Sequence, residues 1–447
     1  MPTEVIRDAL WGAPTLALLL GFGGYFTVRL GLWTPKGIYD AFRRTFFAPK
    51  RKGDGNNLSS LSAIATALGG TVGVGSISGV ALAISVGGAG SVFWMWVCSF
   101  LGIGLKYAEV AVAHSRRRLT KRGYSGGAMY CLKAMGYSRL GALFALLCVL
   151  SAGLGGSTVQ ANSAAEVLAG AVDNSLIRGA LIALITLTVI SGGRKRIGRV
   201  NAALLPFISL GFCFLCLWSI ICHAHLLPHA LCRIFGEALG LRQAAGGIGA
   251  AAMLRVGCVR GTFSHEAGMG SSPISYAAAE ERDPHVQGLW GVTEVFIDSF
   301  VVSTLVAFAV LCTGQDTVRA VFEHCFGGFG SGFYSVALFF FAFAAIISWC
   351  FYGEEAVFFL FPKSACATAL FRLFIAVGAF WGALMPEGKS FAVADIWGAL
   401  MLFPNLFLLY KSRSEIVAFS QGKGFGRAKG GKQSTHGAYR RGGVGAA

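Results

Sequence analysis

The stretch Gly69-Gly-Thr-Val-Gly-Val-Gly75 lies in the middle of an apolar segment that is long enough to cross a membrane. Four of its seven residues are glycine, and each glycine in a helix costs about 1 kcal/mol relative to alanine. Irregular backbone survives within a bilayer only where it lines a cavity or is buried in protein, because lipid satisfies no backbone hydrogen bonds. A helix interrupted at mid-membrane points to a transporter's binding site. The stretch therefore predicts a discontinuous transmembrane helix beside such a site.

Apolar runs of about 20 residues recur along almost the whole chain. Of the 447 residues, 55% are hydrophobic and 13% are charged, whereas soluble domains carry about 25% charged residues. The composition predicts an all-α polytopic membrane protein with about eleven transmembrane helices and no separate soluble domain. The expected spans lie near residues 12–32, 58–86, 88–112, 138–169, 176–193, 199–222, 243–281, 289–313, 332–361, 365–386 and 391–410.

The formal net charge of +17 is concentrated in every second gap between the expected spans. Two examples are the basic runs Arg116–Arg118 and Arg194–Arg196, while intervening gaps such as 171–175 hold almost no cations. This is the positive-inside pattern of a membrane protein, and it speaks against nucleic acid as the partner. It predicts that the N-terminus lies outside and the C-terminus lies in the cytoplasm.

The expected spans divide the chain into a transmembrane domain and a basic tail. The domain covers residues 1–411, with a leading helix near 12–32, a first repeat near 58–222 and a second near 243–410. The tail, residues 412–447, is rich in glycine, lysine and arginine and lacks apolar periodicity, so we expect it to be disordered in the cytoplasm. The tail either contacts anionic lipid headgroups or is a solvated terminus without a role, and the sequence leaves both alternatives open.

A second interruption occurs in the seventh expected span, over Gly261–Pro273. Four spans separate it from the first, so each interruption opens one of two five-span units that run in opposite senses. Unwound helix ends offer N–H groups for a carboxylate and oxygens for a cation, which suits a zwitterion such as an amino acid. Close helix packing by glycine is the alternative, but it does not explain Ser264, His265 and Glu266 in a row at membrane depth.

The chain resembles the alanine/glycine:cation symporter family, also called the sodium:alanine symporters, over roughly residues 10–410. The matching motifs are Ala67–Ser85, Gly87–Trp96, Lys106–Glu109, Gly126–Tyr130, Gln160–Asn162, Arg260-Gly, Phe263–Pro273, Phe296–Asp298 and Ser348–Glu354. The resemblance implies a LeuT-like fold, with a leading helix before a five-plus-five inverted repeat that contains two discontinuous helices. It also implies that a small neutral amino acid enters across the inner membrane by symport with Na⁺ or H⁺ and that no cofactor takes part.

The resemblance also implies the residues of the substrate site. Thr71, Gly73, Gly75 and Ser76 would hold the carboxylate, and Trp349 would close the pocket wall against large side chains. The other implied members are Phe263, Ser264, Gly268, Gln160 and Asn162. Such a pocket separates glycine from alanine poorly, because one methyl group is worth about 1 kcal/mol. Which of the two is carried, and whether D-alanine is carried, stays open.

The sequence departs from the family pattern on the cation side. The family has a Ser-Thr pair where this chain has Ala344-Ala345, at the position where related folds bind Na⁺, and hard cations need oxygen ligands. Sodium symport is therefore one hypothesis, and a carrier that is proton-coupled or weakly coupled is the other, with His265 or Glu266 as the titrating group. The ion-coupling candidates are Gly69, Val72, Ala344, Ala345, His265, Glu266 and Asp298.

Other residue patterns favour structural roles. Lys106 and Glu109 lie one helical turn apart and predict an ion pair, with a cytoplasmic gate contact as the alternative. The cluster Cys222-His223, His225, His229 and Cys232 matches no common zinc spacing, so we expect no metal site. Nothing resembles a nucleophile elbow, a Walker loop or a selectivity filter, which leaves an enzyme and a channel as distant alternatives to a transporter.

Overall fold

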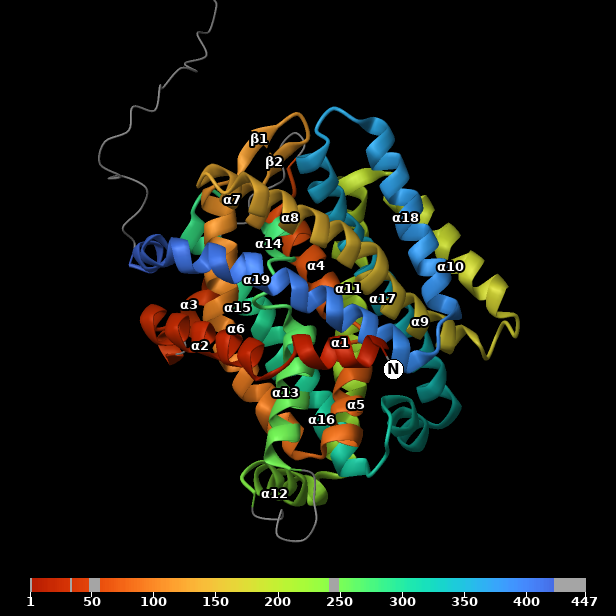
Figure 1. Ribbon diagram of the computed structural model, residues 1–447. Helices are drawn as coiled ribbons and strands as arrows, with labels where there is room; N and C mark the ends of the chain where they lie inside the picture. Colours follow the sequence, from red (N-terminus) through yellow and green to blue (C-terminus); the bar gives the residue numbers. More distant parts are fainter. Residues whose placement is uncertain (1, 33, 48–56, 241–248, 422–447) are drawn as a thin grey trace, which may run out of the picture.

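The computed structural model describes residues 2–32, 34–47, 57–240 and 249–421, and nearly all of them are helical (Figure 1). Within these residues, eight helical stretches are long and apolar enough to cross a membrane. They are α2 (Ala13–Leu30), α6 (Gly90–Ser115), α8 to α9 (Ser138–Leu150 and Ser157–Leu168, joined by π-helix Ser151–Gly156), α11 (Gly193–Cys222), α15 to α16 (Pro284–Val295 and Thr304–Thr313, joined by π-helix Phe296–Ser303), α17 (Val318–Leu360), α18 (Ala365–Leu384) and α19 (Glu387–Ser420). The predicted all-α polytopic fold is confirmed, and the count of eleven spans stays a prediction.

The remaining expected spans coincide with shorter helices. One is α10 (Ser175–Ile190), and the other two are the interrupted spans. The first interrupted span consists of α4 (Ser60–Thr71) and α5 (Ser78–Gly87), and the second consists of α13 (Ala250–His265) and α14 (Pro273–Ala277). Both predicted discontinuous helices are therefore present, and each is broken at its glycine-rich stretch.

The two interrupted spans run in opposite directions. In Figure 1, α4 and α14 lie in the upper half of the molecule, whereas α5 and α13 lie in the lower half. Since α4 precedes α5 and α14 follows α13, the chain descends through the first pair and ascends through the second. This is the arrangement of an inverted repeat.

Short elements cover the two ends of the bundle. At the upper end of Figure 1, strands β1 (Arg118–Thr120) and β2 (Gly123–Ser125) form an antiparallel hairpin next to α7 (Ala128–Ala134). At the lower end lies α12 (Leu227–Ala238), in a segment where the sequence predicts only a loop. The remaining short elements are α1 (Pro2–Leu10), α3 (Pro35–Phe42), π-helix Arg43–Phe47 and 3₁₀-helix Ala224–Leu226.

The last helix is longer than the predicted span 391–410. It continues to Ser420 because Ile416, Val417 and Phe419 are buried against the bundle and Glu415 pairs with Arg116 at 2.5 Å. The predicted disordered tail therefore does not begin at residue 412, and residues 422–447 of that tail lie outside the described part of the chain. Helix α17 likewise begins before the predicted span 332–361, at Val318, and its backbone is non-helical at Gly327.

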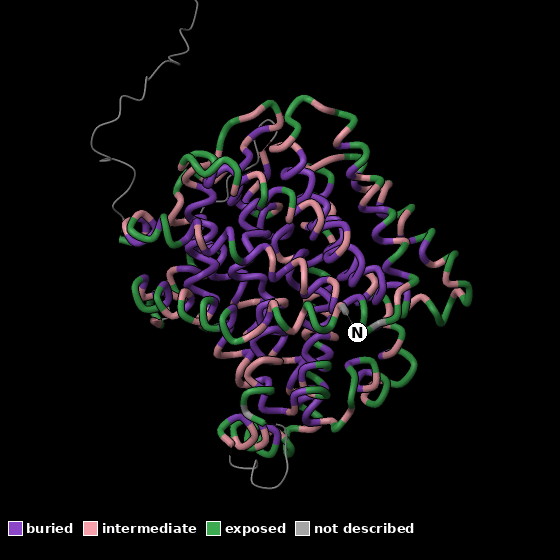
Figure 2. The backbone as a smooth tube through the Cα atoms, viewed as in Figure 1, coloured by how far each residue is buried: buried purple, intermediate pink, exposed green. Residues whose placement is uncertain are grey.

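Buried residues concentrate in the centre of the bundle, as Figure 2 shows, where α13 packs against α6 and α17 packs against α4. The outer helices α10, α11 and α18 expose large apolar side chains instead, such as Phe207, Leu184 and Trp381. An apolar surface of this kind is suited to lipid contact. The polar groups that could act chemically therefore lie inside, around the two helix breaks.

Candidate functional site at the two helix breaks

The first break spans residues 72–77, between α4 and α5. Within it, Ile77 N donates to Gly73 O at 3.2 Å, and Gly79 N donates to Val74 O at 2.8 Å. None of the hydrogen bonds in the described part of the chain uses the amide N–H of Gly75 or Ser76. Side chains from two other helices approach this backbone closely. A Cβ at Gly75 would lie 2.9 Å from Phe263 Cδ1, and a Cβ at Gly73 would lie 3.2 Å from Gln160 Oε1.

The second break spans residues 266–272, between α13 and α14. Glu266 has a left-handed backbone (φ 52°), the only positive φ among the described non-glycine residues, and Gly268 and Gly270 have positive φ as well. A left-handed conformation is unfavourable for a residue with a Cβ and persists only where surrounding contacts enforce it. Here Ser271 Oγ donates to Glu266 Oε2 at 2.5 Å.

Side chains from two other helices hold the second break in place. Glu109 on α6 accepts from Gly270 N at 3.1 Å and from the Asn405 amide on α19. Asn405 in turn donates to Gly268 O at 2.8 Å. The pair thus satisfies both a free N–H and a free carbonyl of the unwound segment, which the membrane interior requires.

Lys106 and Glu109 do not form the ion pair that their spacing predicts. Lys106 Nζ instead donates to Ser272 Oγ at 2.8 Å and pairs with Glu294 at 3.3 Å, and both charged side chains are fully buried. The sequence could not show this, because Glu294 lies far along the chain on α15. Lys106 and Glu109 therefore both have structural roles at the second break.

A small cavity lies between the two breaks. Its volume is about 10 Å³, close to the minimum that holds one water molecule. Six predicted residues line it: Thr71, Gly75, Gln160, Phe263, Glu266 and Trp349. The sequence motifs do not assign the other lining residues to the site; these are Gly70, Ser151, Gly156, Met269 and Ala394.

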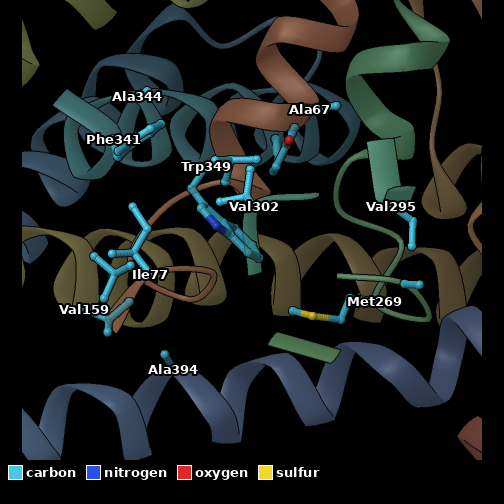
Figure 3. Packing of buried hydrophobic residues seen from close by; sticks show 14 of the residues in the cluster. Ala67, Ile77, Val159, Met269, Val295, Val302, Phe341, Ala344, Trp349 and Ala394 are labelled. Atoms are coloured by element: carbon cyan, nitrogen blue, oxygen red, sulfur yellow. The ribbon is translucent and has the colours of Figure 1, made fainter. Parts of the chain in front are cut away.

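The indole ring of Trp349 occupies the middle of this region, with Met269 and Ala394 nearby (Figure 3). Gly156 packs directly against the ring, where any Cβ would clash. The glycine density of Ser151–Gly156 is a signal that could have indicated this contact.

The other predicted substrate residues lie around the cavity rather than on its lining. Gly73 lies beside Gln160, a lining residue, whose Oε1 accepts from Val74 N at 3.3 Å and so connects α9 to the first break. Asn162 donates to Gly382 O at 3.1 Å and to Met385 O at 2.6 Å, at the end of α18. Gly268 is surrounded by leucine side chains from α2, α6 and α19.

Ser76, Ser264 and Asp298 bring their oxygen atoms together beside the cavity. Ser264 Oγ donates to Asp298 Oδ2 at 2.7 Å and lies 3.0 Å from Ser76 Oγ, which itself donates to the other carboxylate oxygen. Ser299 Oγ adds a contact of 3.2 Å to the same carboxylate. Asp298 is fully buried, and no lysine, arginine or histidine in the described residues forms an ion pair with it.

A second group of ion candidates surrounds Gly69. A Cβ at Gly69 would lie 2.6 Å from Ser348 Oγ and 3.3 Å from Ala344 O. Val72, three residues after Gly69, and Ala345, next to Ala344, are both buried. Ser348 lies one helical turn after Ala344, so a hydroxyl is present on this side although the Ser-Thr pair is not. Asn201 Nδ2 donates to that hydroxyl at 2.8 Å.

His265 is hydrogen-bonded within the protein. Its Nδ1 accepts from Ala267 N at 3.0 Å, and its Nε2 lies 3.9 Å from Cys98 Sγ. The ring is buried, and it lies outside the cavity lining. These contacts favour the interpretation of His265 as a core residue that closes the end of α13.

A larger groove of about 450 Å³ opens on the other side of Phe263. Arg260, Phe391 and Asp395 are among its lining residues, and Arg260 pairs with Asp395 while its guanidinium lies 5.3 Å from the Phe263 ring. At its rim, partial burial raises the pKa of Asp8, but hydrogen bonds and charge from Arg7 and Arg255 leave that pKa below its ordinary value. The Arg260–Asp395 pair and Phe263 thus separate the groove from the cavity.

Among the described residues, which include the cluster Cys222–Cys232, no group of three or more His, Cys, Asp or Glu side chains is placed to hold a metal ion. His223 Nδ1 bonds to Ser219 O at 2.9 Å, and its ring lies 5.6 Å from that of His324.

The paired helix breaks and the buried site between them define a multi-pass membrane transporter with a LeuT fold, not an enzyme. The solved structure of MhsT in complex with L-phenylalanine shows the same fold, with a TM-score of 0.58 over 81% of this chain and 91% of MhsT, at 15% sequence identity. The chain belongs to the sodium:alanine symporter family, because the sequence model of that family matches residues 2–428. The resemblance inferred from the sequence motifs is thereby confirmed.

Curated relatives cover nearly the full length of the chain. The sodium/alanine symporter AgcS of Methanococcus maripaludis is 32% identical over 93% of this chain and 95% of its own length. The amino-acid carrier protein AlsT of Bacillus subtilis is 32% identical over 88% of this chain and 85% of its own. An uncharacterized transporter of Haemophilus influenzae is 34% identical over 93% and 94%.

Proposed function

We propose that this protein carries alanine or glycine, in symport with Na⁺, across the inner membrane, with its N-terminus outside and its C-terminus in the cytoplasm. The observation that carries the substrate class is the narrow cavity between the two helix breaks, walled by Trp349 and Phe263. A bound amino acid requires these walls to move apart, and the smallest amino acids require the least movement. D-alanine fits the same size limit.

The first break supplies what a substrate carboxylate needs. The N–H groups of Gly75 and Ser76 lie at the start of the outer half-helix α5, where the helix dipole favours an anion. Thr71 and Gln160 add polar side chains to the cavity wall. The carboxylate binds to this backbone.

The cluster of Ser76, Ser264 and Asp298 supplies what Na⁺ needs. It offers hydroxyl and carboxylate oxygens, the ligands of hard cations, and it holds a buried negative charge without an ion-pair partner among the described residues. Because Ser76 lies in the first break and Ser264 lies in the last turn of α13, one cation there joins both interrupted helices. Na⁺ binding then favours the conformation that binds the amino acid, which is the thermodynamic basis of coupling.

Coupling to protons is the second candidate, and one observation favours it. Glu266 lines the cavity with a buried carboxyl group, while Ala344 and Ala345 lack the hydroxyls of the family pattern. A proton on Glu266 would then replace the cation. Glu266→Gln removes the titrating group but leaves the Asp298 cluster intact, so Na⁺-dependent uptake by this variant supports the sodium proposal.

Replacing Trp349 by leucine is expected to widen the substrate range. The smaller side chain enlarges the cavity, so valine should begin to compete with labelled alanine for binding to the purified protein. Affinity for alanine itself should fall about tenfold, the effect of a poorly filled apolar pocket. Competition by a panel of neutral amino acids in the presence of Na⁺ measures both changes and tests the substrate class.

Trp381→Leu is the matched control, because Trp381 lies on α18 and is 64% exposed on the lipid-facing surface. It should leave the competition profile unchanged. If the wild-type protein binds large amino acids as tightly as alanine, the proposed substrate class is wrong.

A further inference from the structure

The two half-helices that carry the site are joined to each other at one end of the molecule. Leu58, just before α4, forms an isolated parallel β-bridge with Ala279, just after α14. Leu58 N donates to Ala278 O, and Glu280 N donates to Leu58 O, both at 3.0 Å. One turn deeper, Ser275 Oγ donates to Ala63 O at 3.3 Å. The start of α4 and the end of α14, which are the ends remote from the two breaks, are therefore joined by backbone hydrogen bonds.

Asn57 connects this bridge to the β-hairpin. Its Nδ2 donates to Glu280 Oε1 at 2.7 Å, and its Oδ1 accepts from Tyr124 N at 2.6 Å. Arg194 on α11 donates to Tyr124 O at 2.8 Å and pairs with Glu355 on α17 at 3.1 Å. A single side chain thus links α4, the chain after α14 and a hairpin that is itself anchored to the surrounding bundle.

Arg117 also fixes the segment after α14. Its guanidinium donates to Ala279 O at 2.6 Å and to Glu281 O at 2.5 Å, and it stacks 3.9 Å from the centre of the Tyr124 ring. His114 Nε2 lies 2.8 Å from Glu281 O. The two carbonyls are thereby held in the position that allows the β-bridge to form.

Fewer interactions close the opposite end of the site than close the end with the β-bridge. There, the groove of about 450 Å³ reaches down to Arg260, and one ion pair with Asp395 and the rings of Phe263 and Phe391 separate it from the cavity. The basic runs at residues 116–118 and 194–196 place the β-bridge on the face that the positive-inside pattern assigns to the cytoplasm.

We propose that the β-bridge of Leu58 with Ala279, latched by Asn57 and Arg117, is the cytoplasmic gate of the transporter. Opening toward the cytoplasm separates α4 from α14, which breaks the backbone bonds and the Asn57 contacts together. Because these bonds exist only in the closed arrangement, Asn57 stabilises that arrangement relative to the open one. This proposal rests on alternating access in the proposed function but not on the identity of the substrate or the ion.

The test is the accessibility of an introduced cysteine at Ala63 on α4, which is fully buried and whose carbonyl accepts from Ser275 on α14. The background carries serine in place of the three exposed cysteines of the chain, Cys222, Cys232 and Cys366. A membrane-impermeant maleimide is applied to inside-out vesicles without Na⁺ or amino acid. We expect Asn57→Ala to accelerate labelling of the cysteine by about five- to tenfold, the effect of losing one or two hydrogen bonds that exist only in the closed state. Asn57→Asp, which loses the donor to Glu280, should act in the same direction.

Asn174→Ala is the matched control, since Asn174 caps α10 far from the bridge in the same manner, by accepting from backbone amides. It should leave the labelling rate unchanged. A second reporter cysteine at Phe391, in the outer groove, should not gain reactivity in right-side-out vesicles. An unchanged rate in both Asn57 variants, or an equal gain at the outer reporter, would overturn the proposal. Failure of alanine uptake in wild-type protein would instead count against the proposed function, so the two failures can be told apart.

Discussion

Replacing Gly75 by leucine is expected to abolish amino-acid uptake while leaving membrane insertion intact. Even a single Cβ at this position would lie 2.9 Å from Phe263 Cδ1 and 3.4 Å from Phe263 O, so the larger leucine side chain must enter the cavity or push the second break away. Overpacking of this kind costs about 1–3 kcal/mol in a well-packed core, and the displaced volume is the volume that the substrate needs. We therefore expect binding of labelled alanine to fall by about 100-fold or more.

The control for this variant is Gly21→Leu on the exposed face of α2, where a Cβ would meet no atom within 4 Å. Both variants add the same side chain to a membrane-spanning segment, so equal amounts of inserted protein should be recovered. Normal uptake by Gly75→Leu would show that the substrate site is not between the two breaks.

Replacing Asp298 by asparagine is expected to remove the Na⁺ dependence of binding and transport. The change keeps the size of the side chain and removes one negative charge from a fully buried position. At an effective dielectric constant of 20, a unit charge at 4 Å contributes about 4 kcal/mol, so Na⁺ affinity should fall by about 100-fold or more. The measurement is the Na⁺ concentration that gives half-maximal binding of labelled alanine.

Asp173→Asn is the matched control, because Asp173 is exposed in the loop before α10. It should leave the Na⁺ dependence unchanged. Ser264→Ala removes one neutral ligand and is expected to have a smaller effect than Asp298→Asn. If Asp298→Asn retains the wild-type Na⁺ dependence, the cation binds elsewhere, and the oxygens of Ala344 and Ser348 near Gly69 become the next candidates.

The helix breaks were predictable because their cause is local. Glycine density at 69–75 and the polar run at 264–266 are incompatible with continuous helices in lipid, and the structure interrupts the spans beside them, at 72–77 and 266–272. The motif resemblance added the partners Gln160, Phe263 and Trp349, which line the same cavity. The end of α19 was misjudged because burial of Ile416 against the bundle, not hydropathy, continues that helix.

The supporting contacts were not predictable, because they join residues far apart in sequence. Glu109 bonds to Gly270 across 161 positions, and Ser76 meets Asp298 across 222. The spacing of Lys106 and Glu109 on one helix suggested a local ion pair, but tertiary packing gave each a distant partner. A lone sequence shows which polar residues are buried at depth, and only the fold shows which of them meet.

The most direct test of the account is uptake of labelled alanine by proteoliposomes that contain the purified protein. An inward Na⁺ gradient is imposed at constant pH, and K⁺ replaces Na⁺ in the parallel sample. We predict that unaltered alanine accumulates above the external concentration with Na⁺ and only equilibrates with K⁺. Accumulation driven by a pH gradient and insensitive to Na⁺ would contradict the account.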